Sequence, residues 1–163
     1  MQSQPLQADG GLKITGGRNV VVKGGVIEHN INYAEKDGCT GMQECPKGQS
    51  RAERMRAVYL LSWTGTMHFE GVEIKGSQIW EGFNVSNSKP GAILQVQNVR
   101  FSDQLQKPII FSKEAGDHDG VDVFQTWNGP EQLRIDRMTI QDSKYQTFWL
   151  EPRKKEGKIP KKI

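Results

Sequence analysis

Four eight-residue segments of this chain share one pattern of apolar residues, although connections of very different length separate them. They are VVVKGGVI from Val20, MHFEGVEI from Met67, LQVQNVRF from Leu94 and LRIDRMTI from Leu133. In each segment, apolar or small residues stand at the first, third, sixth and eighth positions. Alternation is typical of a strand with one buried face, and the step of three positions indicates a corner between two strands. The segments do not suit helices, because apolar spacings of three and four do not persist for ten residues.

Another short apolar run precedes each of these segments, and a last run follows them. The runs are LKIT (12–15), AVYLLSW (57–63), GFNVSN (82–87), GVDVFQTW (120–127) and QTFWLEP (146–152). Together they supply three strands per turn, and neighbouring strands stack about 4.8 Å apart. The sequence therefore predicts an all-β fold, a right-handed parallel β-helix (solenoid) of about four to five coils. We assign residues 1–11 to an N-terminal extension, 12–152 to the β-helix domain and 153–163 to a basic C-terminal tail.

The net charge of +3 comes from the end of the chain. Residues 153–163 hold six lysines or arginines and one glutamate, so this tail carries +5 and the rest of the chain −2. Such a tail either keeps the chain end in solvent or binds an acidic partner, and we favour the first. Because the remainder is slightly acidic, we expect no nucleic-acid partner. No apolar run approaches the roughly 20 residues of a membrane helix, so we expect no membrane partner.

The two cysteines, Cys39 and Cys45, lie close together in a polar, glycine-rich segment, GCTGMQECPKG. Their spacing matches no common zinc motif and no histidine lies nearby, so we expect no metal site there. A local disulfide is favoured over two free thiols. A disulfide would indicate an oxidising compartment, and hence a protein that works outside the cell or at its surface.

Residues 12–152 resemble the pectate-lyase-like right-handed β-helix proteins. The resemblance rests on the repeated segments and on two stretches, TGTMHFEGVEIKG (64–76) and HDGVDVFQTWNGPEQLRIDRMTIQDSKYQTFWLEP (118–152). It implies an extracellular protein that recognises a polysaccharide, with lyase or glycoside hydrolase activity left open. Structural members also exist, so the alternative is a non-catalytic module of a phage tail fibre or a cell-surface assembly. Exposed strand edges at the solenoid ends would then favour a homo-oligomer or a larger assembly.

Long connections at 28–56 and 102–119 are expected to flank the outer face of the first strand of each coil. Outward positions on that face predict a substrate-binding set of Ser86, Gln125, Trp127, Trp149 and Glu151. Ser62, Asn84 and Asp122 share the face, and Trp63 is expected near a strand end. Polar groups between aromatic rings suit a sugar chain, because its apolar faces stack on rings while its hydroxyls take hydrogen bonds.

The stretch HDGVDVFQTW (118–127) brings together His118, Asp119 and Asp122 as candidate catalytic residues. They could form an acid–base site, bind a sugar or a cation such as Ca²⁺ without turnover, or simply make a turn. Which side chains of this strand face the interior stays open. If Val121 and Val123 point inward, alternation turns Gln125 inward as well.

Each of the two possible enzyme activities, lyase and hydrolase, needs additional catalytic side chains. A lyase would need a base, for which Lys107, Lys113, Arg54 and Arg56 are available. A hydrolase would need two carboxylates from the set Asp119, Asp122 and Glu151.

Overall fold

A computed structural model describes residues 6–30, 56–77, 79, 81–102, 122–141 and 146–151. These residues form fourteen strands. No helix among them is long and apolar enough to cross a lipid bilayer. His118, Asp119, Cys39, Cys45 and the basic tail lie outside the described residues, so the predictions that concern them stay predictions.

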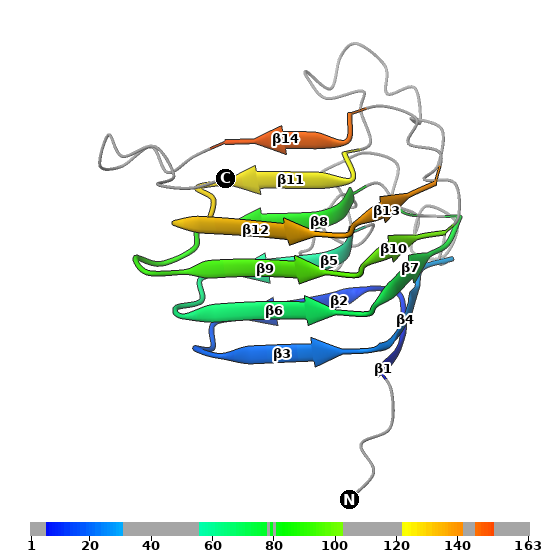
Figure 1. The fold of residues 1–163 in the computed structure, drawn as a ribbon, viewed down its shortest axis with the longest axis horizontal. Coiled ribbons are helices and arrows are strands. Elements are labelled where there is room, and N and C mark those ends of the chain that lie inside the picture. The colour runs from blue at the N-terminus through cyan, green and yellow to red at the C-terminus, as the bar shows by residue number, and fades with distance from the viewer. Residues whose placement is uncertain are drawn as a thin grey trace, which may run out of the picture.

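The strands stack in three parallel sheets, as Figure 1 shows. Sheet A contains β1 (Leu6–Asp9), β4 (Gly25–Glu28), β7 (Glu73–Lys75), β10 (Arg100–Phe101) and β13 (Thr139–Ile140). Sheet B contains β2 (Leu12–Thr15), β5 (Arg56–Leu61), β8 (Glu81–Ser86), β11 (Phe124–Trp127) and β14 (Phe148–Leu150). Sheet C contains β3 (Val20–Lys23), β6 (Thr66–Glu70), β9 (Ile93–Gln97) and β12 (Gln132–Asp136). Each coil runs from sheet B to sheet C to sheet A, which is the predicted right-handed parallel β-helix.

The repeated segments coincide with the second and third strands of the coils, in register. Val20 pairs with Met67, Met67 with Leu94, and Leu94 with Leu133, each across one coil step. The first positions of all four segments therefore stack in one inward row. The pattern read from the sequence is confirmed as a set of stacked rungs.

Phenylalanine rings from all three sheets form the centre of the core. Phe83 lies 5.1 Å from Phe69, 5.3 Å from Phe124 and 6.2 Å from Phe101, measured between ring centroids, and all four side chains are fully buried. Phe124 stacks on Phe83 with an interplanar angle of 27° and so points inward. This decides which side of the strand faces the interior: Gln125, the next residue, lies on the outer face.

The corner between sheets C and A depends on one residue of each repeat in the left-handed region. Gly24 and Gly71 occupy this position with φ of 66°, and Asn98 and Arg137 occupy it with φ of 51° and 54°. Glycine adopts this backbone freely and asparagine tolerates it, whereas a residue such as arginine is strained there by about 1–2 kcal/mol. The fourth corner is therefore the least favourable.

Replacing Arg137 with glycine is expected to raise the free energy of unfolding by about 0.5–1 kcal/mol, because it relieves this strain. The ion pair that is lost, with Asp136, joins side chains 66% and 60% exposed and contributes little. Chemical denaturation measures the change. Asn98→Gly is the matched control and should gain less; a loss of stability in Arg137→Gly would contradict the corner assignment.

The two ends of the solenoid differ from the middle coils. β1 lies in the segment that the sequence assigned to an extension, and it pairs in parallel with β4. At the other end, the inward-facing side chains of Ile135, Phe148 and Leu150 are 37%, 43% and 37% exposed. Ile135 was expected to be a core residue like Phe69 in the same row. That expectation is wrong, because β12 is the last strand of sheet C among the described residues and nothing there covers it.

Candidate functional site on the outer face of sheet B

The outer face of sheet B carries the predicted substrate-binding residues in rows across the coils. The central row contains Lys13, Tyr59, Asn84, Gln125 and Trp149, paired strand to strand. The next row contains Thr15, Leu61, Ser86 and Trp127. Parallel pairing thus brings Gln125 beside Trp149 and Ser86 beside Trp127, from segments far apart in the sequence.

A third row of this face contains the charged side chains of Arg56 and Glu81, which lie at the starts of β5 and β8. A kink near the start of the strand turns these side chains outward. A Cβ on Gly82 would lie 2.5 Å from the Phe101 ring, so this position faces the interior, as does Phe83 after it. Because two successive residues face inward, Glu81 before them and Asn84 after them both face outward. Only glycine fits at position 82, since a Cβ would also lie 2.4 Å from the Val123 carbonyl oxygen.

Hydrogen bonds join these rows into one polar network. Asn84 Nδ2 donates to Glu81 Oε2 at 2.6 Å and to Gln125 Oε1 at 2.9 Å. Gln125 Nε2 donates to Asp122 Oδ2 at 3.1 Å. Ser86 Oγ donates to Asn84 Oδ1 at 3.0 Å. The carboxylates and amides therefore hold one another in fixed positions across two coils.

Two cations complete the network. Arg56 forms an ion pair with Glu81, and their side chains are only 13% and 15% exposed. The Arg56 guanidinium carbon lies 4.3 Å from the centre of the Tyr59 ring, and Lys13 Nζ lies 5.3 Å from the same ring. The Arg56–Glu81 pair thus places two mostly buried opposite charges side by side, with the Tyr59 ring against the guanidinium, as burial of charge requires.

The polar part of this face is closed to solvent. Asn84, Asp122, Gln125 and Ser86 are 0%, 3%, 5% and 8% exposed. We expected them to line an open groove, and they do lie on the predicted face, but as buried groups that bond to one another. A ligand could reach little of their surface without rearrangement.

Aromatic rings at the C-terminal side of the face are more accessible. Trp127 and Trp149 lie on neighbouring coils with ring centroids 5.9 Å apart and planes inclined at 32°, and both are half-buried. Beside them, Asn128 Nδ2 donates to Asn87 Oδ1 at 3.2 Å. The result is an aromatic surface bordered by amides.

Other predicted site residues take different places. The backbone of Glu151 is fixed by Thr126, whose Oγ1 donates to the Glu151 carbonyl at 3.1 Å and accepts from its N–H at 2.9 Å. Trp63 does not border the face: its ring is fully buried and its Nε1 donates to the Ile93 carbonyl at 3.3 Å. The alternation misplaced Trp63 because the chain turns at Ser62, which has a φ of 54°.

Sequence reasoning did not place Tyr59, Glu81 and Arg56 on this face. Tyr59 shares the row of Asn84, and Glu81 shares the row of Arg56. Alternation along β5 is the signal that could have placed Tyr59, whereas the outward positions of Glu81 and Arg56 depend on the kink at the start of their strands, which no alternation predicts.

Among the described residues, no group of three or more histidine, cysteine, aspartate or glutamate side chains is placed to hold a metal ion. The possible Ca²⁺ site predicted around Asp122 includes His118 and Asp119, which lie outside them.

Comparisons with known proteins returned no match to a family model, a curated protein or a solved structure.

Proposed function

We propose that this protein binds a polysaccharide on the outer face of sheet B, outside the cell or at its surface. The observation that carries the proposal is the inclined, half-buried pair of Trp127 and Trp149 beside a rigid polar network. The proposal also agrees with the resemblance of the repeats to pectate-lyase-like proteins. The extracellular location depends on the Cys39–Cys45 disulfide expected from the sequence.

The tryptophan pair suits a sugar chain for a physical reason. Aromatic rings offer large, stiff apolar surfaces that lose little conformational entropy when they bind, and the apolar faces of sugar rings pack against them. Trp127 and Trp149 come from successive coils, so a chain that runs along the solenoid axis can contact both rings.

Polar groups around the pair supply the hydrogen bonds that sugar hydroxyls need. The amides of Asn87 and Asn128 border Trp127, and Asn87 is exposed. Gln125 and Ser86 pair with Trp149 and Trp127 in the same rows, but both are buried, so they help to hold the face in shape rather than contact the ligand. Because the network of Asn84, Gln125 and Asp122 is already bonded, it supports the rings rigidly, which reduces the entropic cost of binding.

The same network favours binding over turnover. Asp122, the one described member of the predicted catalytic set, is 3% exposed and accepts a hydrogen bond from Gln125. Glu81 is held by Arg56 and Asn84. A carboxylate that attacks or protonates a glycosidic bond must reach the substrate, so these two are better suited to holding the face in shape.

Replacing Trp149 with alanine is expected to weaken glycan binding about tenfold, because a stacked aromatic face contributes on the order of 1 kcal/mol or more. Calorimetric titration against uronate-containing and neutral polysaccharides measures the affinity, and the ligand that binds the unmodified protein is used for the variants. Trp149→Phe keeps a ring and should lose less.

Val21→Ala is the matched control, since Val21 lies on sheet C and is 64% exposed. Its affinity should equal that of the unmodified protein. Equal losses in Val21→Ala and Trp149→Ala, or no glycan bound at all, would overturn the proposal. Release of reducing ends or unsaturated products in the same mixtures would show turnover and assign the face to catalysis.

A further inference from the structure

The corner that follows β8 and β11 carries a pair of side-chain amides with a fixed polarity. Asn128 Nδ2 donates to Asn87 Oδ1 at 3.2 Å, so the Asn87 oxygen faces its neighbour on the next coil. The Asn87 nitrogen, on the other arm of the same amide, points away from Asn128. Within the described part of the chain this nitrogen donates to no group, and Asn87 is exposed. Its N–H groups are therefore open to a ligand.

Backbone contacts hold the amide pair in place beside Trp127. The Asn87 N–H donates to the Trp127 carbonyl at 2.9 Å. Ser88 Oγ, on a side chain only 2% exposed, lies 3.0 and 2.6 Å from the carbonyl oxygens of Asn128 and Gly129. Asn87 and Asn128 have φ of 52° and 55°, a left-handed backbone that asparagine tolerates better than most residues. The donor is thus held in position before a ligand arrives, which lowers the entropic cost of binding.

The amide pair lies next to an aromatic surface. The rings of Trp127 and Trp149 are half-buried, with centroids 5.9 Å apart. Trp127 directly precedes Asn128 in the chain, and Ser86, which pairs with Trp127, directly precedes Asn87. A group bound at this corner therefore meets N–H donors on one side and an aromatic face on the other.

The acceptors that polysaccharides carry differ in how well they match this combination. A hydroxyl or a ring oxygen can use the donor but adds no apolar surface. A carboxylate is charged, and an uncharged amide only partly replaces the water that it loses. An acetamido group joins a carbonyl, which only accepts, to a methyl group, which gains by leaving water for an apolar surface. The acetamido group is therefore the acceptor that matches both the donor and the ring beside it.

The corner also carries an exposed cation, Lys89, two residues after Asn87. Its side chain forms no hydrogen bond or ion pair within the described part of the chain. A carboxylate could recruit it only by ordering a long flexible side chain, which costs conformational entropy. The amide of Asn87 is already fixed, so this corner favours an uncharged acceptor.

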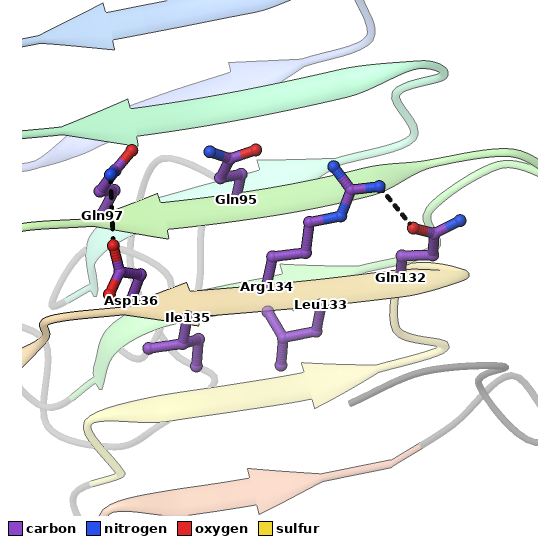
Figure 2. Close-up of a pocket in the computed structure, with 7 residues that line it drawn as sticks. All are labelled: Gln95, Gln97, Gln132, Leu133, Arg134, Ile135 and Asp136. Carbon is purple, nitrogen blue, oxygen red and sulfur yellow. Dashed lines mark hydrogen bonds between the residues drawn. The ribbon is translucent and has the colours of Figure 1, made fainter.

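A depression elsewhere, on β9 and β12 of sheet C, is less suited to such a sugar. Figure 2 shows the side chains that line it, and none of these is aromatic. Gln97 Nε2 is engaged, because it donates to Asp136 Oδ2 at 3.2 Å. Gln132 Oε1 likewise accepts from Arg134 at 2.7 Å. This depression offers charges and amides but no ring on which a sugar can stack.

We infer that the corner beside Trp127 recognises an N-acetylated amino sugar, with the acetamido carbonyl accepting from Asn87 Nδ2 and the acetamido methyl group packed on the Trp127 ring. The inference rests on the proposed glycan binding and names the sugar that the site selects. Asn87 is then the specificity-determining residue, whereas the tryptophan pair supplies affinity for sugar rings in general.

Tetrasaccharides with different substituents test this choice on the full-length protein. Chitotetraose carries an acetamido group on the second carbon of each sugar, where its deacetylated form carries an ammonium group and cellotetraose a hydroxyl. Isothermal titration calorimetry should show chitotetraose binding at least about tenfold more tightly than cellotetraose, because it adds a hydrogen bond and a packed methyl group. Tetragalacturonate provides the carboxylate comparison and should also bind more weakly than chitotetraose.

Asn87→Asp reverses the polarity of the site. The aspartate still accepts from Asn128 and tolerates the left-handed backbone, but it has no side-chain N–H to donate. The affinity for chitotetraose should fall about tenfold, whereas the deacetylated tetrasaccharide should bind more tightly than before, because its ammonium groups can donate to the new carboxylate. Asn98→Asp is the matched control, since Asn98 is also exposed, has a φ of 51° and lies at the corner between sheets C and A. It should bind chitotetraose as the unmodified protein does.

Two further variants separate the amide from charge. Asn87→Gly keeps the left-handed backbone without strain and removes the amide, so it should lose the preference for chitotetraose over cellotetraose without adding a charge. Lys89→Gln removes the nearby cation and should leave the affinity for chitotetraose unchanged.

The outcomes distinguish this inference from the proposed function. Equal affinity for chitotetraose and cellotetraose, equal losses in Asn87→Asp and Asn98→Asp, or tighter binding of tetragalacturonate that Lys89→Gln removes would each overturn the N-acetyl preference and leave glycan binding in place. Failure of chitotetraose to bind while another glycan binds has the same meaning. A loss in Arg134→Ala but not in Asn87→Asp would place the sugar in the depression of Figure 2, against the inference. Binding of no glycan at all would overturn the proposed function itself.

Discussion

Replacing Phe83 with alanine is expected to lower the free energy of unfolding by about 3–5 kcal/mol, enough to leave the chain largely unfolded at moderate temperature. Phe83 is fully buried and its ring contacts Phe69, Phe101 and Phe124, which come from all three sheets. The substitution would leave a cavity between neighbouring coils. The strands around it cannot move together to fill it, because backbone hydrogen bonds fix their spacing. Urea denaturation monitored by circular dichroism measures the loss.

Phe148→Ala is the control for Phe83. Phe148 occupies the same row two strands further on, where it lies 6.0 Å from Phe124 between ring centroids, but it is 43% exposed. It should lose less than about 2 kcal/mol, in proportion to the smaller area it buries. Equal losses at the two positions would show that the C-terminal coil is covered in solution.

Removing the Arg56 side chain is expected to lower the free energy of unfolding by about 3 kcal/mol, because it leaves Glu81 mostly buried without its cation. Glu81 Oε2 would keep only the hydrogen bond from Asn84, and the contact of the guanidinium with Tyr59 would also be lost. Thermal and urea denaturation of Arg56→Ala measure the cost.

A double substitution separates charge from packing in this network. Arg56→Met together with Glu81→Gln removes both charges, keeps most of the volume and leaves an amide oxygen that accepts from Asn84. Replacing a whole buried ion pair is often neutral, so the double variant should regain most of the stability lost in Arg56→Ala. If the double variant is as unstable as Arg56→Ala, buried charge is not the cause of the loss.

The sequence determined the coil and the side of each strand that faces its interior. Successive side chains of a strand point to opposite faces, so the alternation in the four repeated segments predicts the inward rows directly. Glycines at Gly24 and Gly71, in the same position of their repeats, agree with the left-handed backbone found at that corner. These features are local, because covalent geometry and backbone conformation decide them before any packing.

The sequence predicted the candidate site only in part, because alternation indicates the face on which a side chain lies but not the residues to which it bonds there. The outer positions of Ser86 and Trp149 follow from alternation, but the bonds of Asn84 to Glu81 and Gln125 join residues three and forty-one positions apart. The first bond needs the kink at Gly82, and the second needs the registration of two coils separated by a long connection.

Only the tertiary structure decided how deeply each side chain is covered. Phe69 and Ile135 occupy the same row of their repeats, yet Phe69 is fully buried and Ile135 is 37% exposed. The inward direction of both is a property of their own strands. Burial depends on the strand stacked above, which Phe69 has and Ile135, at the edge of sheet C, does not among the described residues. The same dependence makes Asn84 a buried group on an outer face, a distinction that no local pattern contains.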